Sequence, residues 1–214
     1  MTLTLPTREL VGLLADVYPF ADPDEDNPAW HRVVVQWDGS RLHALAGNGM
    51  RVAWMSWGPD DGDAPIPGLE YPADDSDWTM AILPKEAKEI ATKFKVGAKD
   101  GDSPLRITGN PDRLIVERDS DTVVGVALRS VALARPWDDD APDIMSIINT
   151  IREDSRTCVP RTEVAYSGFN LADFANPKVV RQRGPVELRF GPKSTYIRIG
   201  EHFHGAIAQA TVDR

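Results

Sequence analysis

The sequence predicts an α+β fold built from repeated units, each with one strand, one helix and then three strands. The first observation is a leucine-proline step that occurs twice, at Leu5-Pro6 and at Leu83-Pro84. In both places an apolar segment runs into the proline and an amphipathic pattern follows it. Proline suits the first position of a helix because its missing N–H would have no partner there. The second observation is that three short alternating segments, separated by turn residues, follow each helix.

The first unit covers residues 1–57. Its helix is predicted after Pro6, since apolar residues recur at the spacing of a buried helical stripe, namely Leu10, Leu13, Leu14 and Val17. The predicted strands that follow are residues 30–37, 42–46 and 51–57. Asp38-Gly39 and Asn48-Gly49 separate these strands, and such pairs are typical of tight antiparallel turns.

The second unit covers residues 78–130 and has a basic helix. One helical face carries Ala87, Ile90, Ala91 and Phe94, and another carries Lys85, Lys88, Lys95 and Lys99. Residues 85–99 hold five lysines against two glutamates, a local charge of 5 − 2 = +3 in a chain whose formal net charge is −9. The predicted strands of this unit are residues 105–108, 113–117 and 122–129. Basic charge is therefore concentrated on this helix.

A connector and a third unit are expected after the second unit. Residues 131–161 are interpreted as the connector, because prolines and aspartates surround an apolar patch at 144–151. The third unit covers residues 162–214, with a weak strand-helix pattern at 162–180 and strands at 186–190, 195–199 and 204–212. Residues 1–130 then form one complete domain of two units, and residues 162–214 form a half-domain.

Composition excludes several classes of protein. The chain has 214 residues, of which 42% are hydrophobic, and this is enough for a large core. We expect a cytoplasmic protein, because no apolar run could span a membrane and no secretory leader is recognisable. The single cysteine cannot form an internal disulfide. The acidic surplus argues against nucleic-acid binding over the whole surface, but screening within about 8 to 10 Å leaves a local basic face effective.

Four segments resemble the beta subunit of bacterial DNA polymerase III, the beta sliding clamp. They are residues 3–9 (LTLPTRE), 42–53 (LHALAGNGMRVA), 80–88 (MAILPKEAK) and 141–144 (APDI). The resemblance covers most of residues 2–152 and, more weakly, 163–212, so the chain is similar to a family member shortened to about three of its six half-domain units. It implies the DNA clamp fold, with antiparallel sheets outside and helices lining a ring. It also implies a DNA sliding clamp, a processivity factor that encircles duplex DNA and tethers a DNA polymerase or other replication proteins.

The resemblance gives the basic helix a function, because helices in such positions line the hole of the ring. They contact the phosphate backbone of double-stranded DNA without reading its sequence. The candidate DNA-binding residues are Arg8, Lys85, Lys88, Lys95, Lys99, Lys178, Arg181 and Arg183. Taken alone, the lysine pattern is more typical of a solvated helix face.

A peptide-binding groove is the second site that the resemblance implies. It would receive a short motif of a DNA polymerase or another clamp-binding protein. By matching positions, the candidate residues are Trp30, Gly47, Gly49, Met50, Arg51, Val52, Pro142, Ile147 and Thr211. The alternative is that residues 47–52 form an ordinary tight turn. The chain departs from the family at Asn48 and Met50, which concerns partner binding more than the fold.

The sequence carries no pattern of an enzyme. His202 and His204 could ligate a metal, but Glu201 is their only adjacent acid and paired histidines of this kind are more often structural. The chain has no phosphate-binding glycine loop, nucleophile elbow or cysteine-histidine pair. We therefore expect a non-enzymatic protein without a metal or cofactor, and a metal hydrolase that uses the two histidines is the third hypothesis.

The unit count predicts the assembly. By the resemblance, a ring of the family contains twelve such units with their helices inward. Twelve units divided by three units per chain give four chains, a homotetramer. The expected partners are duplex DNA, a polymerase or other clamp-binding motif, and copies of the chain, with no membrane. The alternative is a clamp-like interaction protein that binds a polymerase or clamp partner without encircling DNA.

Overall fold

The computed structural model describes residues 2–61, 77–97, 103–110, 112–118, 127–135, 141–157, 164–175 and 185–210. The first unit contains β1 (Thr2–Pro6), α1 (Thr7–Val17), β2 (Val33–Trp37), β3 (Leu42–Gly47) and β4 (Arg51–Trp57). The second contains β5 (Trp78–Ile82), α2 (Pro84–Lys93), β6 (Pro104–Asn110), β7 (Arg113–Arg118) and β8 (Leu128–Leu133). The third contains α4 (Gly168–Ala172), β9 (Val186–Phe190), β10 (Ser194–Ile199) and β11 (Phe203–Ala208), and α3 (Ile144–Thr157) precedes it. Short 3-10 helices follow α1, β4 and α4, at Tyr18–Phe20, Pro59–Asp61 and Asp173–Ala175.

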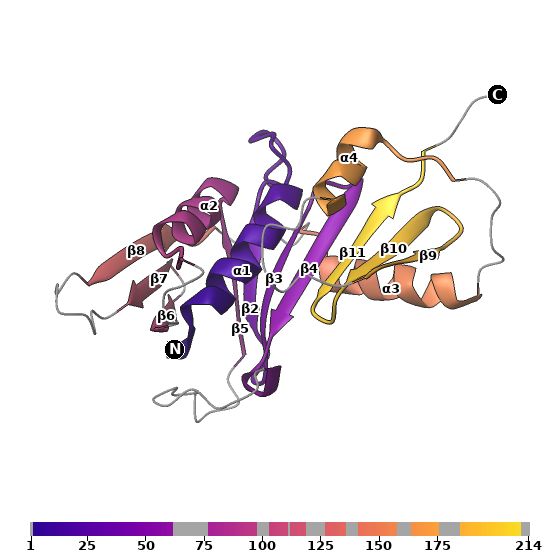
Figure 1. Ribbon diagram of the computed structural model, residues 1–214. Helices are drawn as coiled ribbons and strands as arrows, with labels where there is room; N and C mark the ends of the chain where they lie inside the picture. The colour runs from indigo at the N-terminus through magenta and orange to yellow at the C-terminus, as the bar shows by residue number, and fades with distance from the viewer. Residues whose placement is uncertain are drawn as a thin grey trace.

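The strands form two antiparallel sheets (Figure 1). The smaller sheet has the order β1-β6-β7-β8, and the larger has the order β5-β2-β3-β4-β11-β10-β9. The first two units exchange their first strands, because β1 pairs with β6 of the second unit and β5 pairs with β2 of the first. The third unit extends the larger sheet, since β11 pairs with β4.

The helices α1 and α2 cover one face of the sheets. Leu13 of α1 and Ile90 of α2 are buried in one apolar core with inward-facing strand residues such as Val35, Met55 and Ile107. The two helices lie side by side on the near side of the sheets in Figure 1. We call this the inner face.

The helix α3 covers the opposite face of the larger sheet. Its Ile144 and Ile148 pack in a separate apolar cluster with Val34, Leu45 and Val52. Side chains of a strand alternate between the two faces, so helices on both faces bury nearly every residue of β2, β3 and β4. This explains why these strands are continuous apolar runs. We call this the outer face.

Aromatic packing joins the third unit to the first on the inner face. The ring centroids of Phe20 and Phe174 lie 4.8 Å apart, and those of Phe20 and Phe203 lie 5.8 Å apart. Edge-on and tilted rings at these distances attract one another beyond the area that they bury. The third unit is therefore fixed both by strand pairing and by an aromatic cluster.

Several element boundaries differ from the sequence-based expectations. The helix α2 ends at Lys93, so Lys95 lies beyond it. The strand β8 runs from Leu128 to Leu133, so it shares only its first two residues with the strand predicted at 122–129 and enters the expected connector, while residues 122–126 lie outside the described residues. The rest of that connector contains the unpredicted helix α3, and α4 has only five residues. None of the described helices is long and apolar enough to cross a membrane.

Candidate nucleic-acid interface and partner groove

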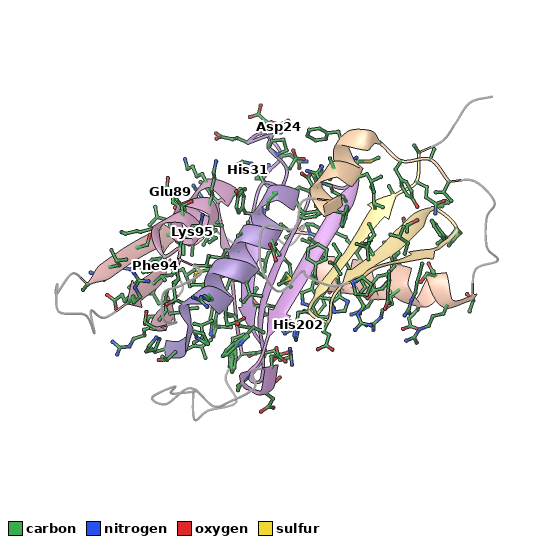
Figure 2. All side chains as sticks on the ribbon, in the orientation of Figure 1. Asp24, His31, Glu89, Phe94, Lys95 and His202 are labelled. Carbon is green, nitrogen blue, oxygen red and sulfur yellow. The ribbon has the colours of Figure 1, made fainter. Side chains whose placement is uncertain are left out.

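The exposed side of α2 is basic because one of its acids points inward. Glu86 accepts hydrogen bonds from the backbone N–H of Leu83 (3.0 Å) and of Leu133 (3.2 Å), which caps the helix and ties it to β8. The other acid of the helix, Glu89, is exposed. Figure 2 shows Glu89 and Lys95 at α2.

Lys85, Lys88 and Lys95 are exposed, and α2 buries Ala87 and Ile90 on its opposite side. Within the described part of the chain these three lysines form no hydrogen bond or ion pair, whereas Lys93 donates to the carbonyl of Arg129. The three ammonium groups are therefore available to an anion.

Arg8 lies near the end of α2 although it belongs to the first unit. It is exposed on α1, and its guanidinium donates to the carbonyl of Gly97 at 3.0 Å, just after α2. The packing of α1 on α2 thus places Arg8 next to the segment that carries Lys95. The other predicted cations, Lys99, Lys178, Arg181 and Arg183, lie outside the described residues.

The structure brings together part of the predicted peptide site on the outer face. Trp30 and Ile147 pack against the cluster that contains Val52. A Cβ at Gly47 would lie 2.6 Å from Val52 Cγ1 and 2.9 Å from the Trp30 ring, so only glycine permits this packing. Gly49 has a φ of 79° in the turn that follows, a conformation that favours glycine.

Arg51 does not belong to this surface. Its side chain is only 3% exposed and points to the inner face, where the guanidinium pairs with Asp173 at 2.5 Å and donates to Asn170 Oδ1 at 2.7 Å and to the carbonyl of Pro19 at 3.1 Å. It also lies over the ring of Phe169 at 5.5 Å. Arg51 therefore connects the first unit to α4, and its assignment to the outer groove is not supported by its position. Met50 is exposed at the preceding turn, and Thr211 lies outside the described residues.

A groove lies on the other side of α3, between this helix and the larger sheet. It has a volume of about 890 Å³ between α3 and the edge of the larger sheet. Its floor is apolar, from Val34, Leu45 and Met145, and Pro142 is the one residue of the predicted peptide site that lines it. Polar lining residues of α3 include Asn149 and Glu153. Sequence reasoning missed this groove because it depends on α3, although Ile144, Ile147, Ile148 and Ile151 have helical spacing.

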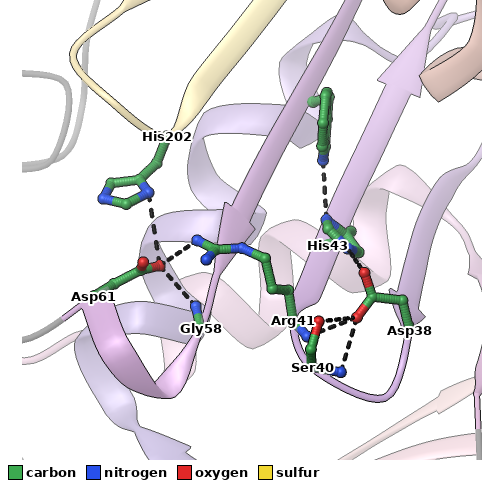
Figure 3. A network of polar contacts seen from close by, with 8 residues as sticks. Asp38, Ser40, Arg41, His43, Gly58, Asp61 and His202 are labelled. Carbon is green, nitrogen blue, oxygen red and sulfur yellow. Dashed lines mark hydrogen bonds and ion pairs between the residues drawn. The ribbon is translucent and has the colours of Figure 1, made fainter.

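A polar network lies on the outer face where β2, β3 and β4 meet (Figure 3). The indole N–H of Trp54 donates to His43 Nδ1 at 3.0 Å, and Trp can only donate, so the ring proton of His43 is on Nε2. That nitrogen donates to Asp38 Oδ2 at 2.8 Å. Burial alone would raise the pKa of Asp38, but hydrogen bonds from His43, Ser40 and the backbone N–H of Arg41 hold it well below its usual value.

His204 continues this row of rings across the sheet. Its ring lies 4.9 Å from that of Trp54, and its Nδ1 shares a hydrogen bond of 2.6 Å with the hydroxyl of Tyr196. Burial and the positive charges of Arg152, Arg198 and His202 lower the pKa of His204 to about 4. Hydrogen bonds and ring contacts thus connect these side chains across neighbouring strands of the larger sheet.

A second network joins the turn before β11 to the end of β4. Asp61 accepts from Arg41 at 2.5 Å and from the N–H of Gly58 at 2.7 Å, and His202 Nδ1 lies 3.6 Å from the same carboxylate oxygen (Figure 3). Burial would raise the pKa of Asp61, but these partners lower it overall. His202 and His204 thus have separate partners. The described residues contain no group of three metal-ligating side chains.

Solved structures provide the comparison for this arrangement. The chain is similar to the beta subunit of DNA polymerase III from Thermotoga maritima, with a TM-score of 0.66, 10% identity and coverage of 100% of this chain and 66% of that chain. The chain has the sliding-clamp fold. The DNA polymerase sliding clamp from Bacillus subtilis gives a TM-score of 0.62 at 13% identity, and the beta subunit from DNA polymerase of Streptococcus pyogenes gives 0.64 at 13% identity.

These comparisons confirm the predicted fold class. The chain spans slightly less than two thirds of the Bacillus subtilis clamp, 65%, while that clamp covers 100% of this chain. For Streptococcus pyogenes the two shares are 66% and 99%. No protein-family model and no curated protein sequence matches the chain.

Proposed function

We propose that this protein is a non-enzymatic clamp that closes into a homo-oligomeric ring around duplex DNA and tethers a DNA polymerase or another replication protein. The observation that supports this most is the row of exposed lysines on and beside α2, Lys85, Lys88 and Lys95, within a sliding-clamp fold. Arg8 from the neighbouring helix α1 extends the same surface.

The expected binding to DNA is weak and independent of sequence. Lysine ammonium groups on a helix surface contact phosphates, which position a duplex without reading bases. The chain has a formal net charge of −9, so its overall field repels DNA and binding depends on a local basic surface such as that of α2. Affinity should fall steeply with salt, because each phosphate contact releases counterions.

The test is a triple charge reversal with a matched control. The variant K85E/K88E/K95E should bind duplex DNA more weakly, and the slope of log affinity against log salt should lose about 0.9 for each contact removed. The control R106E/R113E/R129E makes the same change in net charge on exposed positions of the smaller sheet, whose register puts all three side chains on its open face. Binding should be reduced far less by this control.

Two outcomes would count against the proposal. If the lysine variant bound like the parent at low salt, α2 would not be the DNA interface. If both triple variants weakened binding equally, the effect would come from net charge and not from a site. Circular dichroism of both variants checks that the fold is retained.

A second candidate is an interaction protein that binds a polymerase or clamp partner without encircling DNA. The observation that favours it is the groove of about 890 Å³ beside α3, which has the size and mixed lining of a binding site and needs no ring. A short apolar peptide should shift the backbone amide resonances of Val34 and Thr79, and N149W, which fills the groove, should abolish these shifts. Shifts confined to residues 47–52 would move the site to the turn predicted from the sequence.

A further inference from the structure

Among the described residues, the third unit has no partner strand at the sheet edge where each of the first two units has one. In order along the chain, β9, β10 and β11 correspond to β2, β3 and β4 of the first unit. The strand β2 is flanked by β5, and β6 is flanked by β1, each supplied by the other unit. In the described residues, β9 is the last strand of its sheet. An edge of this kind is a template for another strand.

The inner face of β9 is apolar and exposed. Leu188 is opposite Ile197 and Val186 is opposite Ile199, and both isoleucines belong to the inner core. Val186 is nevertheless 56% exposed and Leu188 46% exposed. The corresponding residues of β2, Val33 and Val35, are 0% and 1% exposed, because α1, α2 and β5 surround them. In the third unit, the inner-face residues of β10 are therefore buried while those of β9 are exposed.

The segment before α4 corresponds to the exchanged strand β5. Ala81 lies two residues before Leu83, the N-cap of α2, and Ala165 lies two residues before Ser167, the N-cap of α4. Ala81 forms an isolated bridge with Arg135 just after β8, and Ala165 forms one with Ala210 just after β11. In each case the bridge joins the first strand of a unit to the end of its last strand. The other side of β5 pairs with β2.

We infer that two copies of the chain exchange these segments through their third units. Residues 164–167 of one copy pair antiparallel with β9 of the other, and the exchange is reciprocal about a two-fold axis. This rests on the proposed function, since it supplies one of the interfaces that a ring of such chains needs. The two half-domains then form a domain like that of residues 2–133, and Val186 and Leu188 become part of its core.

The register follows from the first domain. Ala81 is opposite Val34, which lies three residues before the end of β2. Glu187 lies three residues before the end of β9, so Ala165 of one copy is opposite Glu187 of the other. Residues directly opposite in antiparallel strands have Cα atoms about 4.5 to 5.5 Å apart, which is within the range of a disulfide.

Cysteine cross-linking tests this register. In a C158S background, mild oxidation of A165C/E187C should give a covalent dimer of about twice 23.6 kDa on a denaturing gel, and reductant should remove it. The control A165C/K193C places the second cysteine in the turn after β9 and should give little dimer. A cross-link that leaves the mass of a single chain, or equal dimer yields from both pairs, would overturn the proposal.

Light scattering of V186K/L188K gives an independent measurement. These lysines should reduce the molar mass to that of species lacking this interface, whereas V131K/L133K on the exposed outer side of β8 should leave the third-unit dimer. A parent chain that stays at one-chain mass at high concentration, or a V186K/L188K variant with the parent mass, would overturn the exchange. The DNA test is separate, because V186K/L188K retains the cations of α2. If the cysteines cross-link but K85E/K88E/K95E binds DNA normally, only the proposed function fails.

Discussion

Replacing Arg51 with alanine should destabilise the protein, because this side chain ties the first unit to the third. The substitution removes the ion pair with Asp173 and leaves the carbonyl of Pro19 and the Asn170 oxygen without a donor. Breaking a fully buried ion pair costs about 3 to 5 kcal/mol. Arg51 is 3% exposed but Asp173 is 29% exposed, so solvation reduces the cost and we expect about 3 kcal/mol.

Thermal unfolding followed by circular dichroism measures this cost. For a chain of this length about 3 kcal/mol corresponds to a decrease in Tm of roughly 6 to 12 °C. The control is R129A, which breaks an ion pair with Glu117 of 3.0 Å in which Arg129 is 60% exposed. Such a pair contributes about 0.2 to 1 kcal/mol. If R51A lowered Tm no more than R129A, the inter-unit role of Arg51 would be wrong. If R51A were as stable as the parent but lost peptide binding, Arg51 would belong to the predicted peptide-binding site.

Three further predictions concern Gly47 and the histidines His204 and His202. G47A should lower Tm, because its Cβ would lie 3.0 Å or less from Val52, Trp30 and the Arg51 carbonyl, at a cost of about 1 to 3 kcal/mol. G168A, with open space around its Cβ, is the control, and an equal effect of both would contradict the packing. The pKa of His204 is about 4 in the folded protein, below its value in the unfolded chain. Protonation of His204 therefore favours unfolding, so its contribution to the free energy of unfolding is present above pH 6.5 and is lost as the pH falls toward 4. H204Q should remove about 2 kcal/mol of that acid sensitivity in denaturant titrations, and an unchanged pH profile would refute the assignment. Finally, the parent and H202A should give the same result in an assay for metal-dependent hydrolysis, because a non-enzymatic clamp has no such activity. An activity of the parent that H202A loses would favour the metal hydrolase.

The repeated units could be predicted because their signals are local. A helix begins at each leucine-proline step, with Pro6 as the N-cap of α1 and Pro84 as the first residue of α2, and Asn48-Gly49 forms the turn that its sequence favours. The opposite orientations of Arg51 and Val52 could also have been predicted, because neighbouring residues of a strand point to opposite faces.

The remaining features depend on contacts between distant segments. The prolines and aspartates around α3 suggested a linker. The isoleucines of this segment indicate a packed helix only once the sheet face that they cover is known. The row of His43, Trp54 and His204 requires the register of three strands, and His204 reaches it only because β11 pairs with β4. A single sequence carries no direct signal for such pairing.

Retention on circular DNA tests the proposed ring most directly. The protein is mixed with a closed circular duplex at low salt, washed at high salt to remove molecules held only by phosphate contacts, and the DNA is then cut once with a restriction enzyme. A ring should survive the wash on the circle and be released when the ends become free, since high salt weakens the lysine contacts but does not open the topological link. Complete loss during the wash, or equal retention before and after cutting, would contradict encirclement and favour the interaction protein.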